Sequence, residues 1–157
     1  MKKLIAMILV VCSVMLLASG CDLFKKEKTF SKSGMSITLT EDFVEKDRIT
    51  FTSTYESDDI IVTTTKEDMS HFILTGLDLD GYTKEVIKVN KLTVLPQHKD
   101  GLTYFEYEKE ASGKEFHYYA FTFEGEDAYW LIQFACEQKN HEKLEETIFK
   151  YAKSVKV

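Results

Sequence analysis

The sequence predicts an α+β domain, a three-layer α/β/α sandwich around a mainly antiparallel sheet. Three long apolar runs between residues 102 and 136 are separated by short turn sequences, as in a meander of neighbouring strands. The runs carry apolar residues on both faces, and such a sheet has to be covered on both sides. Helical patterns lie before and after the meander and supply the two covering layers.

The domain opens with patterns typical of strands. Met35, Ile37 and Leu39 alternate with polar residues, which is the period of a half-buried strand. A second alternating run covers residues 49–55, and a β-branched run over 60–65 follows it after a polar turn. We therefore expect these two runs to form a hairpin.

Residues 67–90 change to a helical pattern. A short helix is expected over 67–74, and a second helix over 79–89 has apolar residues along one face. Asp78 or Asp80 can serve as the N-cap of the second helix.

The meander is expected to consist of strands over 102–109, 115–123 and 128–136. A short strand over 92–95, ended by Pro96, is expected to precede it. One face of the last strand carries Trp130, Ile132, Phe134 and Cys136, and the other carries Tyr129, Leu131 and Ala135. A final helix, capped by Asn140 and running to about Ser154, is expected to cover one face, and the helical region 68–90 the other.

The first twenty residues have a composition of their own. A basic start is followed by a run from Leu4 to Ala18 that is apolar apart from Ser13, and then by Ser19 and Gly20. This order is the layout of a secretory signal peptide. The apolar run is shorter than the about 20 residues of a membrane span, which disfavours an uncleaved anchor helix.

The residues Leu17-Ala18-Ser19-Gly20-Cys21 resemble a bacterial lipobox. The resemblance implies a diacylglycerol thioether on Cys21 and cleavage after Gly20. It divides the chain into a lipoprotein signal peptide, a lipidated N-terminus with a short tether, and a single globular domain, over residues 1–20, 21–33 and 34–157. The acyl chains would anchor the protein to the cell membrane on its extracytoplasmic face.

The charges differ between tether and domain. The whole chain of 157 residues has 20 basic and 26 acidic residues, a net charge of −6. The tether carries a net +2, whereas residues 34–157 hold 14 basic and 24 acidic residues, a net −10. Nucleic-acid binding is not expected, because it needs clustered positive charge. The tether lysines suit an anionic membrane surface, and they equally suit a tether that only has to stay soluble.

From about residue 30 onward, the order of patterns is similar to the PsbP-like fold, which includes small bacterial lipoproteins. The likeness begins with the strand Gly34-Met35-Ser36-Ile37-Thr38-Leu39. It is greatest in the run 129–136 and the helix that ends at Ala152-Lys153-Ser154-Val155. Proteins of this fold are mostly binding or assembly proteins, so the resemblance implies a non-catalytic role. None of their functional residues corresponds to a position in this chain.

Few residues point to chemistry. Cys136 is the cysteine left over once the signal peptide is removed and Cys21 is acylated, and its apolar run favours a small buried hydrophobe over a nucleophile. The histidines are His71, His98, His117 and His141, and their spacing is not that of a zinc site. His117 could meet an acid across the sheet.

The acidic motifs also favour structural roles. Asp78-Leu79-Asp80-Gly81 fails as a calcium loop, because Gly76 and Ile87 occupy the positions that need acids. The acidic pairs Asp58-Asp59 and Glu126-Asp127 are interpreted as turn formers, with a weak divalent-ion site as the alternative. We expect no cofactor, no metal site and no catalytic residues.

Three functions remain open. The first is a membrane-anchored, non-catalytic binding or assembly module with a protein partner at the cell surface. The second is a carrier of a small apolar or amphipathic ligand, and the third is a hydrolase whose site is not visible in the sequence. The aromatic residues of the meander could form a binding surface, and the threonine-rich strands 50–54 and 63–65 could offer an edge for strand addition.

Overall fold

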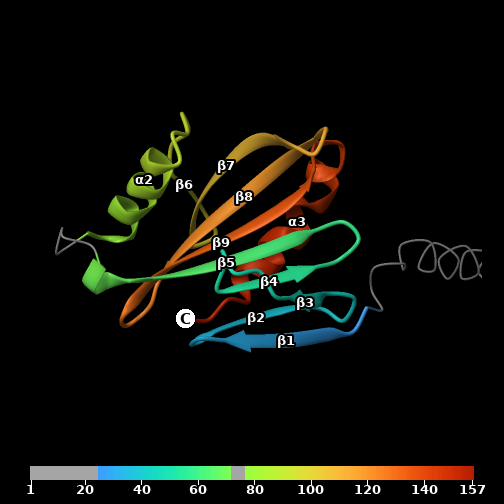
Figure 1. Ribbon diagram of the computed structural model, residues 1–157, viewed down its shortest axis with the longest axis horizontal. Coiled ribbons are helices and arrows are strands. Elements are labelled where there is room, and N and C mark those ends of the chain that lie inside the picture. The colour runs from blue at the N-terminus through green and yellow to red at the C-terminus, as the bar shows by residue number, and fades with distance from the viewer. Residues whose placement is uncertain (1–24, 72–76) are drawn as a thin grey trace, which may run out of the picture.

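The computed structural model describes residues 25–71 and 77–157 (Figure 1). The expected signal peptide over 1–20, Cys21 and part of the expected helix over 67–74 lie outside the described residues. Within those residues, no helix has the length and apolar character needed to cross a bilayer.

The main sheet of the described chain has seven strands in the order β3-β4-β5-β9-β8-β7-β6, and every neighbouring pair is antiparallel. The strands are β3 (Val44–Lys46), β4 (Ser53–Glu56), β5 (Ile61–Asp68), β6 (Gln97–Lys99), β7 (Leu102–Ala111), β8 (Lys114–Glu124) and β9 (Ala128–Glu137). The meander expected from the sequence is therefore confirmed as β7, β8 and β9.

One face of the sheet is covered by α3 (His141–Lys153) and by a separate hairpin of β1 (Glu27–Lys32) and β2 (Met35–Thr40). Ile148 and Tyr151 of α3 pack with Ile37 and Leu39 of β2 against the sheet residues Ile132 and Phe134 in one apolar cluster. Burying one such side chain stabilises a fold by about 1.5–3 kcal/mol. Figure 1 shows α3 behind the sheet and the hairpin along its lower edge.

The opposite face is contacted by α2 (Leu79–Val89). Its buried residues Tyr82, Val86 and Ile87 pack on Phe105 of β7 and on the β9 residues Tyr129 and Leu131. The expected three-layer α+β architecture is thus confirmed, and α2 and α3, the helices expected over 79–89 and from Asn140 to about Ser154, lie on opposite sides of the sheet.

The N-terminal boundary of the folded domain differs from the expected one. Residues 27–32, expected in the tether, form β1 and pair with β2 in full register. Ser33 and Gly34 connect the two strands with φ values of 55° and 97°. Two positive φ angles are the signature of a type I′ hairpin turn, which matches the twist of the strands that it joins.

Three other segments also differ from expectation. The strand expected over 49–55 begins only at Ser53, and β5 continues through Asp68 where a helix was expected. Residues 92–95 form no strand; the strand of this region is β6, after Pro96. Leu92 and Val94 pack instead against the apolar cluster under α2.

The ends of α2 explain why the chain turns away at this point. The Asp78 side chain accepts a hydrogen bond of 2.7 Å from the Gly81 amide, so the expected N-cap is confirmed. At the other end the Lys91 amide donates to Lys88 O and the Leu92 amide to Ile87 O, with Lys91 at φ 55°. This is a Schellman motif, and it directs Leu92 back onto the core.

In α3, Asn140 occupies the N-cap position, but its side chain makes no capping hydrogen bond.

Candidate interaction surface

The helix α2 covers only part of its face of the sheet. A helix of 11 residues spans about 16 Å, whereas a strand of 11 residues such as β8 spans about 36 Å. Beyond α2, on the same face, lie half-buried side chains of β7, β8 and β9: Tyr107, Phe116, Tyr118 and Gln133. We call these four residues the aromatic platform.

The rings of the platform are ordered by stacking. Tyr107 lies directly opposite Tyr118 in the register, with ring centroids 4.7 Å apart and planes within 6°. Phe105 stacks on Tyr107 at 6.0 Å, and Phe116 lies 6.4 Å from Tyr118. The flat rings present a rigid amphipathic surface that loses little conformational entropy on binding.

Hydrogen bonding fixes the centre of the platform. The Tyr107 hydroxyl donates to Gln133 Oε1 at 2.6 Å, which links β7 to β9 across β8. Burial raises the pKa of Tyr107 to about 12 and also raises the pKa of Tyr118. Both phenols are therefore neutral at physiological pH and act as hydroxyl donors and acceptors.

The threonine-rich strands do not form an edge. β4 lies between β3 and β5, and Thr63 and Thr64 of β5 are paired with β4 on one side and with β9 on the other, so these residues offer no edge to another chain. The edges of the main sheet are β3 and the β6–β7 side. The half-buried Thr63 and Thr65 continue the platform face toward β5, where Thr63 is paired with Gln133.

His117 meets an acid across the sheet, as expected. Its Nε2 lies 2.9 Å from Glu106 Oε2 on β7, and its Nδ1 lies 3.2 Å from Gln138 Oε1. Gln138 in turn donates to Glu108 Oε1 at 2.7 Å, and the His141 ring stacks on His117 at 4.4 Å. Because both nitrogens of His117 face these partners, neither is left to activate a nucleophile.

Cys136 is buried in the cluster under α3, as expected, and forms no disulfide. Burial raises the pKa of its thiol to about 11. The thiol is therefore protonated at neutral pH, which is unfavourable for nucleophilic catalysis.

His98 lies in an exposed chain of polar groups. Its Nδ1 is 3.3 Å from Thr103 Oγ1, and its Nε2 is 3.5 Å from Asp80 Oδ1. The order of hydroxyl, imidazole and carboxylate is that of the catalytic triad of a hydrolase. Both contacts are long, however, and the imidazole is more than half exposed, so the geometry is unlike that of a working triad.

The acidic pairs singled out in the sequence lie in turns that have structural contacts. Asp127 pairs with Lys66 at 3.3 Å, and Ser57 closes the turn that holds Asp58 and Asp59 by hydrogen bonding to Ile60. No group of three metal-ligating side chains occurs in residues 25–71 and 77–157. The side chain of His71 is not part of the description.

Two of the surface hollows have charged or mixed linings. One of about 430 Å³ is lined by Lys99, Asp100, Glu146, Phe149, Lys150 and Lys153, of which only Phe149 is uncharged. Another, of about 420 Å³, runs along β7 between residues 91–94 and the side chains of Glu106, Tyr107, Glu108 and His117. This second hollow borders the aromatic platform.

No family model and no curated protein matches the chain. Among solved structures, the solution structure of cyanobacterial PsbP (CyanoP) from Synechocystis sp. PCC 6803 is similar, with a TM-score of 0.55 and 10% identity over 85% of this chain and 94% of that one. A crystal structure from Bacteroides thetaiotaomicron VPI-5482 gives a TM-score of 0.54 and 11% identity, over 85% of this chain and 48% of that one. These likenesses establish that the domain has a PsbP-like fold, as the sequence pattern suggested.

Proposed function

We propose that the protein is a lipid-anchored, non-catalytic binding or assembly module on the extracytoplasmic face of the cell membrane. The observation on which the binding role depends is the aromatic platform, a stacked and hydrogen-bonded surface that α2 leaves open. Ordered tyrosines at the surface are typical of protein interfaces, where their apolar rings and polar hydroxyls both find partners.

The anchoring role is supported by the sequence. The lipobox-like residues 17–21 end at Cys21, and the strand β1 begins only six residues later. Such a tether would span about 20 Å at most, at roughly 3.3 Å per residue. The domain would then present its platform close to other proteins at the membrane. Mass spectrometry of the protein from its native host should find acyl groups on Cys21 as the first residue; an unmodified chain beginning at Met1 would refute the anchor.

Photo-crosslinking in intact cells tests the binding role. A photoreactive aromatic amino acid is introduced in place of Tyr118, whose ring lies half-buried in the platform. We expect it to give a reproducible adduct with one membrane or surface protein. The matched control places the same amino acid at the exposed Glu142 on α3, behind the sheet, and should give no such adduct.

A second variant separates the platform from the fold. Gln133→Ala removes the acceptor of the Tyr107 hydroxyl and should reduce the yield of the adduct while the domain stays folded. Equal adducts from positions 118 and 142, or none from either, would refute a binding role for the platform.

A further inference from the structure

The strand β7 has a free outer edge over most of its length. β6 pairs only with residues 102–104 of β7. From Phe105 to Ala111 the opposite edge of β7 is paired with β8, and the described chain places no strand on the outer side. Figure 1 shows β7 along the upper border of the sheet.

The two hairpins that flank β7 determine which backbone groups face outward. The turns Asp100-Gly101 and Ser112-Gly113 both have two positive φ angles, so each is a two-residue type I′ turn. The residues that flank such a turn form a hydrogen-bonded pair, and the direction alternates along the strand. Leu102 therefore points its backbone toward β6 and Ala111 toward β8. Both hairpins give the same result: Glu106, Glu108 and Glu110 direct their N–H and C=O groups to the free edge.

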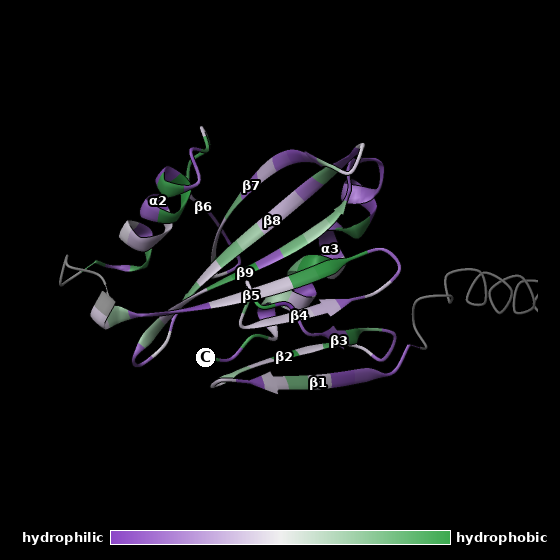
Figure 2. Ribbon diagram, viewed as in Figure 1, coloured by the Kyte–Doolittle hydropathy of each residue, from purple (hydrophilic) through white to green (hydrophobic). Residues whose placement is uncertain are grey.

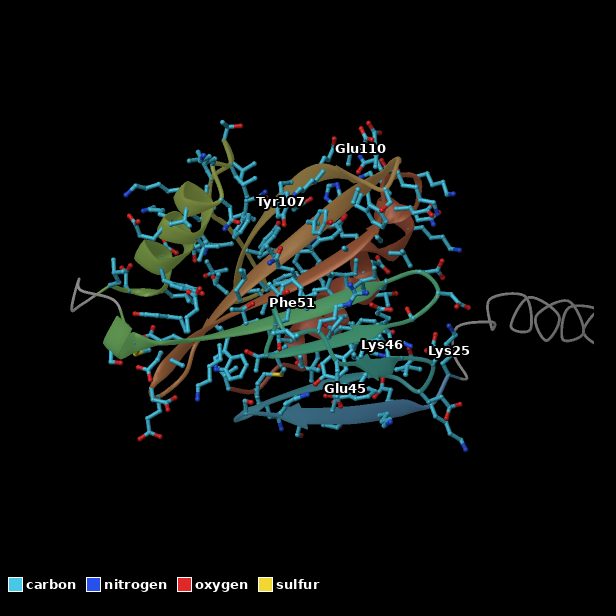
Figure 3. The ribbon with its side chains drawn as sticks, in the orientation of Figure 1. Lys25, Glu45, Lys46, Phe51, Tyr107 and Glu110 are labelled. Atoms are coloured by element: carbon cyan, nitrogen blue, oxygen red, sulfur yellow. The ribbon has the colours of Figure 1, made fainter. Side chains whose placement is uncertain are left out.

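The same three residues place a row of carboxylates along this edge. Their side chains lie on the α3 side of the sheet, whereas Phe105 and Tyr107 lie on the platform side. Figure 2 shows this part of β7 as hydrophilic, and Figure 3 labels Glu110 beyond Tyr107 along the strand. Lys109, on the platform side, lies opposite Phe116 in β8.

Two of the carboxylates are held in position from behind. The bonds from His117 to Glu106 and from Gln138 to Glu108 fix one oxygen of each. The second oxygen of each carboxylate remains an acceptor. The hollow of about 420 Å³ lies beside these residues and brings Leu92 and Val94 to the platform side of the edge. A strand laid here would meet acids on one face, and on the other it would meet Tyr107 and Val94 before it reached Lys109.

We propose that the free part of β7 binds an extended segment of a partner protein by strand addition, and that this segment has basic side chains at every second position with apolar ones between them. The inference rests on the proposed binding function and specifies its partner. A basic side chain paired with each glutamate would be attracted to it, and the alternate apolar side chains would contact Tyr107 and Val94. A second copy of this chain is excluded as the occupant, because antiparallel self-pairing about Glu108 would set glutamate against glutamate.

The test uses the full mature protein in detergent and a labelled peptide with the sequence Lys-Val-Lys-Val-Lys-Val-Lys. We expect the peptide to slow amide hydrogen exchange at Glu106, Glu108 and Glu110 at least tenfold, as measured by NMR. A peptide of the same composition in blocked order, Lys-Lys-Lys-Lys-Val-Val-Val, should give no such protection. Equal protection by both peptides, or none by either, would overturn the proposal.

Two variants separate charge from backbone pairing. The double variant Glu108→Lys/Glu110→Lys should weaken binding at least tenfold relative to Glu142→Lys/Glu146→Lys, which makes the same charge change on α3. Glu108→Pro removes one outward amide and should abolish binding without disturbing the ladder to β8. If Glu108→Pro fails to fold, the charge pair still decides: equal affinity in the two double variants refutes the proposal.

Failure of this inference differs from failure of the proposed function. Suppose that a partner is captured through position 118 but the alternating peptide does not protect β7. The proposed binding function would then be supported, and strand addition at β7 would be refuted as the way in which the partner binds. If the peptide protects β7 but no partner is captured, strand addition at the edge of β7 would be supported, and the proposed role of the aromatic platform in partner binding would be refuted.

Discussion

At the scale of single residues, burial determines how Cys136 behaves. Its side chain is 1% exposed, within the core beneath α3, and its pKa is raised to about 11. We predict that iodoacetamide at pH 8 leaves Cys136 unmodified in the folded protein and alkylates it in denaturant, as read from its tryptic peptide by mass spectrometry. Rapid modification of the native protein would mean that this strand opens far more often than its packing suggests.

Glu137 illustrates how surface charge links stability to pH. Hydrogen bonds from Lys114 and Lys139 lower its pKa to about 2. A carboxylate with a depressed folded-state pKa stabilises the fold above its unfolded pKa of about 4.5 and loses this effect as pH falls toward 2. We predict that Glu137→Gln has a lower free energy of unfolding than wild type at pH 6, and that the difference shrinks at pH 3.

Urea titrations at the two pH values measure this difference. Glu146→Gln, on the exposed side of α3, is the control and should show no comparable change with pH. A deficit of the same size at pH 6 and pH 3 would mean that Glu137 acts through packing and not through its charge.

Sequence reasoning works for residues whose partners are local or whose environment is uniform. Asp78 finds its partner three residues away, and Cys136 lies in an unbroken apolar run, so both roles could be predicted. The contacts among His117, Gln138 and Glu108 join residues 9 to 30 positions apart, and they depend on the register between strands. No spacing rule reveals them before the register is known.

At the scale of elements, the short hairpins depend on glycine. Gly113 has a φ of 76°, a conformation that costs an L-residue about 1–2 kcal/mol. A Cβ at this position would meet no atom within 4 Å, so the cost of Gly113→Ala would come from the backbone alone. We predict that Gly113→Ala lowers the free energy of unfolding by about 1–2 kcal/mol in urea titrations.

The preceding position supplies the matched control. Ser112 also has a positive φ, of 53°, and asparagine tolerates this region better than serine. Ser112→Asn should therefore be neutral or slightly stabilising. A loss of stability in Ser112→Asn, or no loss in Gly113→Ala, would contradict the assignment of the turn as type I′.

The N-cap of α2 gives a second prediction at this scale. The bond from the Gly81 amide to Asp78 satisfies a backbone donor that the helix cannot pair. We expect Asp78→Ala to destabilise the domain by about 0.5–2 kcal/mol and Asp78→Asn to cost much less, because asparagine keeps an acceptor oxygen. Equal losses in the two variants, measured by chemical denaturation, would mean that the charge of Asp78 matters more than its capping bond.

Elements were predicted well where the pattern was long and missed where it was short. The three meander strands have 10, 11 and 10 residues, and the long apolar runs between short turn sequences identified them. β6 has three exposed residues, so no apolar period marks it. The turn pair Asp100-Gly101 was the available signal for the β6–β7 hairpin, as Ser33-Gly34 was for β1–β2.

At the scale of the whole molecule, the layers could be predicted and their extent could not. Apolar residues on both faces of β8 and β9 require two covers, and this argument gave the three layers correctly. The length of strand that a covering helix buries depends on the rise per residue, which is much smaller in a helix than in a strand. The face under α3 is completed by the β1–β2 hairpin, whereas the face under α2 has no second element in the described chain, and its uncovered part is the platform.

The fold also changes the expected balance of forces at the membrane. Of the four tether lysines, Lys25 pairs with Asp42 at 3.0 Å and Lys32 with Glu45 at 2.7 Å. Two of the positive charges expected to face anionic lipid are thus compensated within the domain, and residues 34–157 carry a net −10. Each remaining lysine would contribute about 1 kcal/mol at best near an anionic surface, and the acidic body opposes it. Attachment to the membrane should therefore depend on the acyl chains expected on Cys21.

We predict that Cys21→Ser protein stays in the supernatant with both neutral and anionic vesicles at physiological salt, whereas acylated protein sediments with both. The two proteins should have the same melting temperature, because strand pairing in the described residues begins at Glu27, six positions after Cys21. Binding of Cys21→Ser to anionic vesicles alone, reversed by salt, would mean that the lysines attach the domain without the acyl chains. The same comparison in whole cells should move the Cys21→Ser protein out of the membrane fraction, since two of the four tether lysines are already paired within the acidic domain.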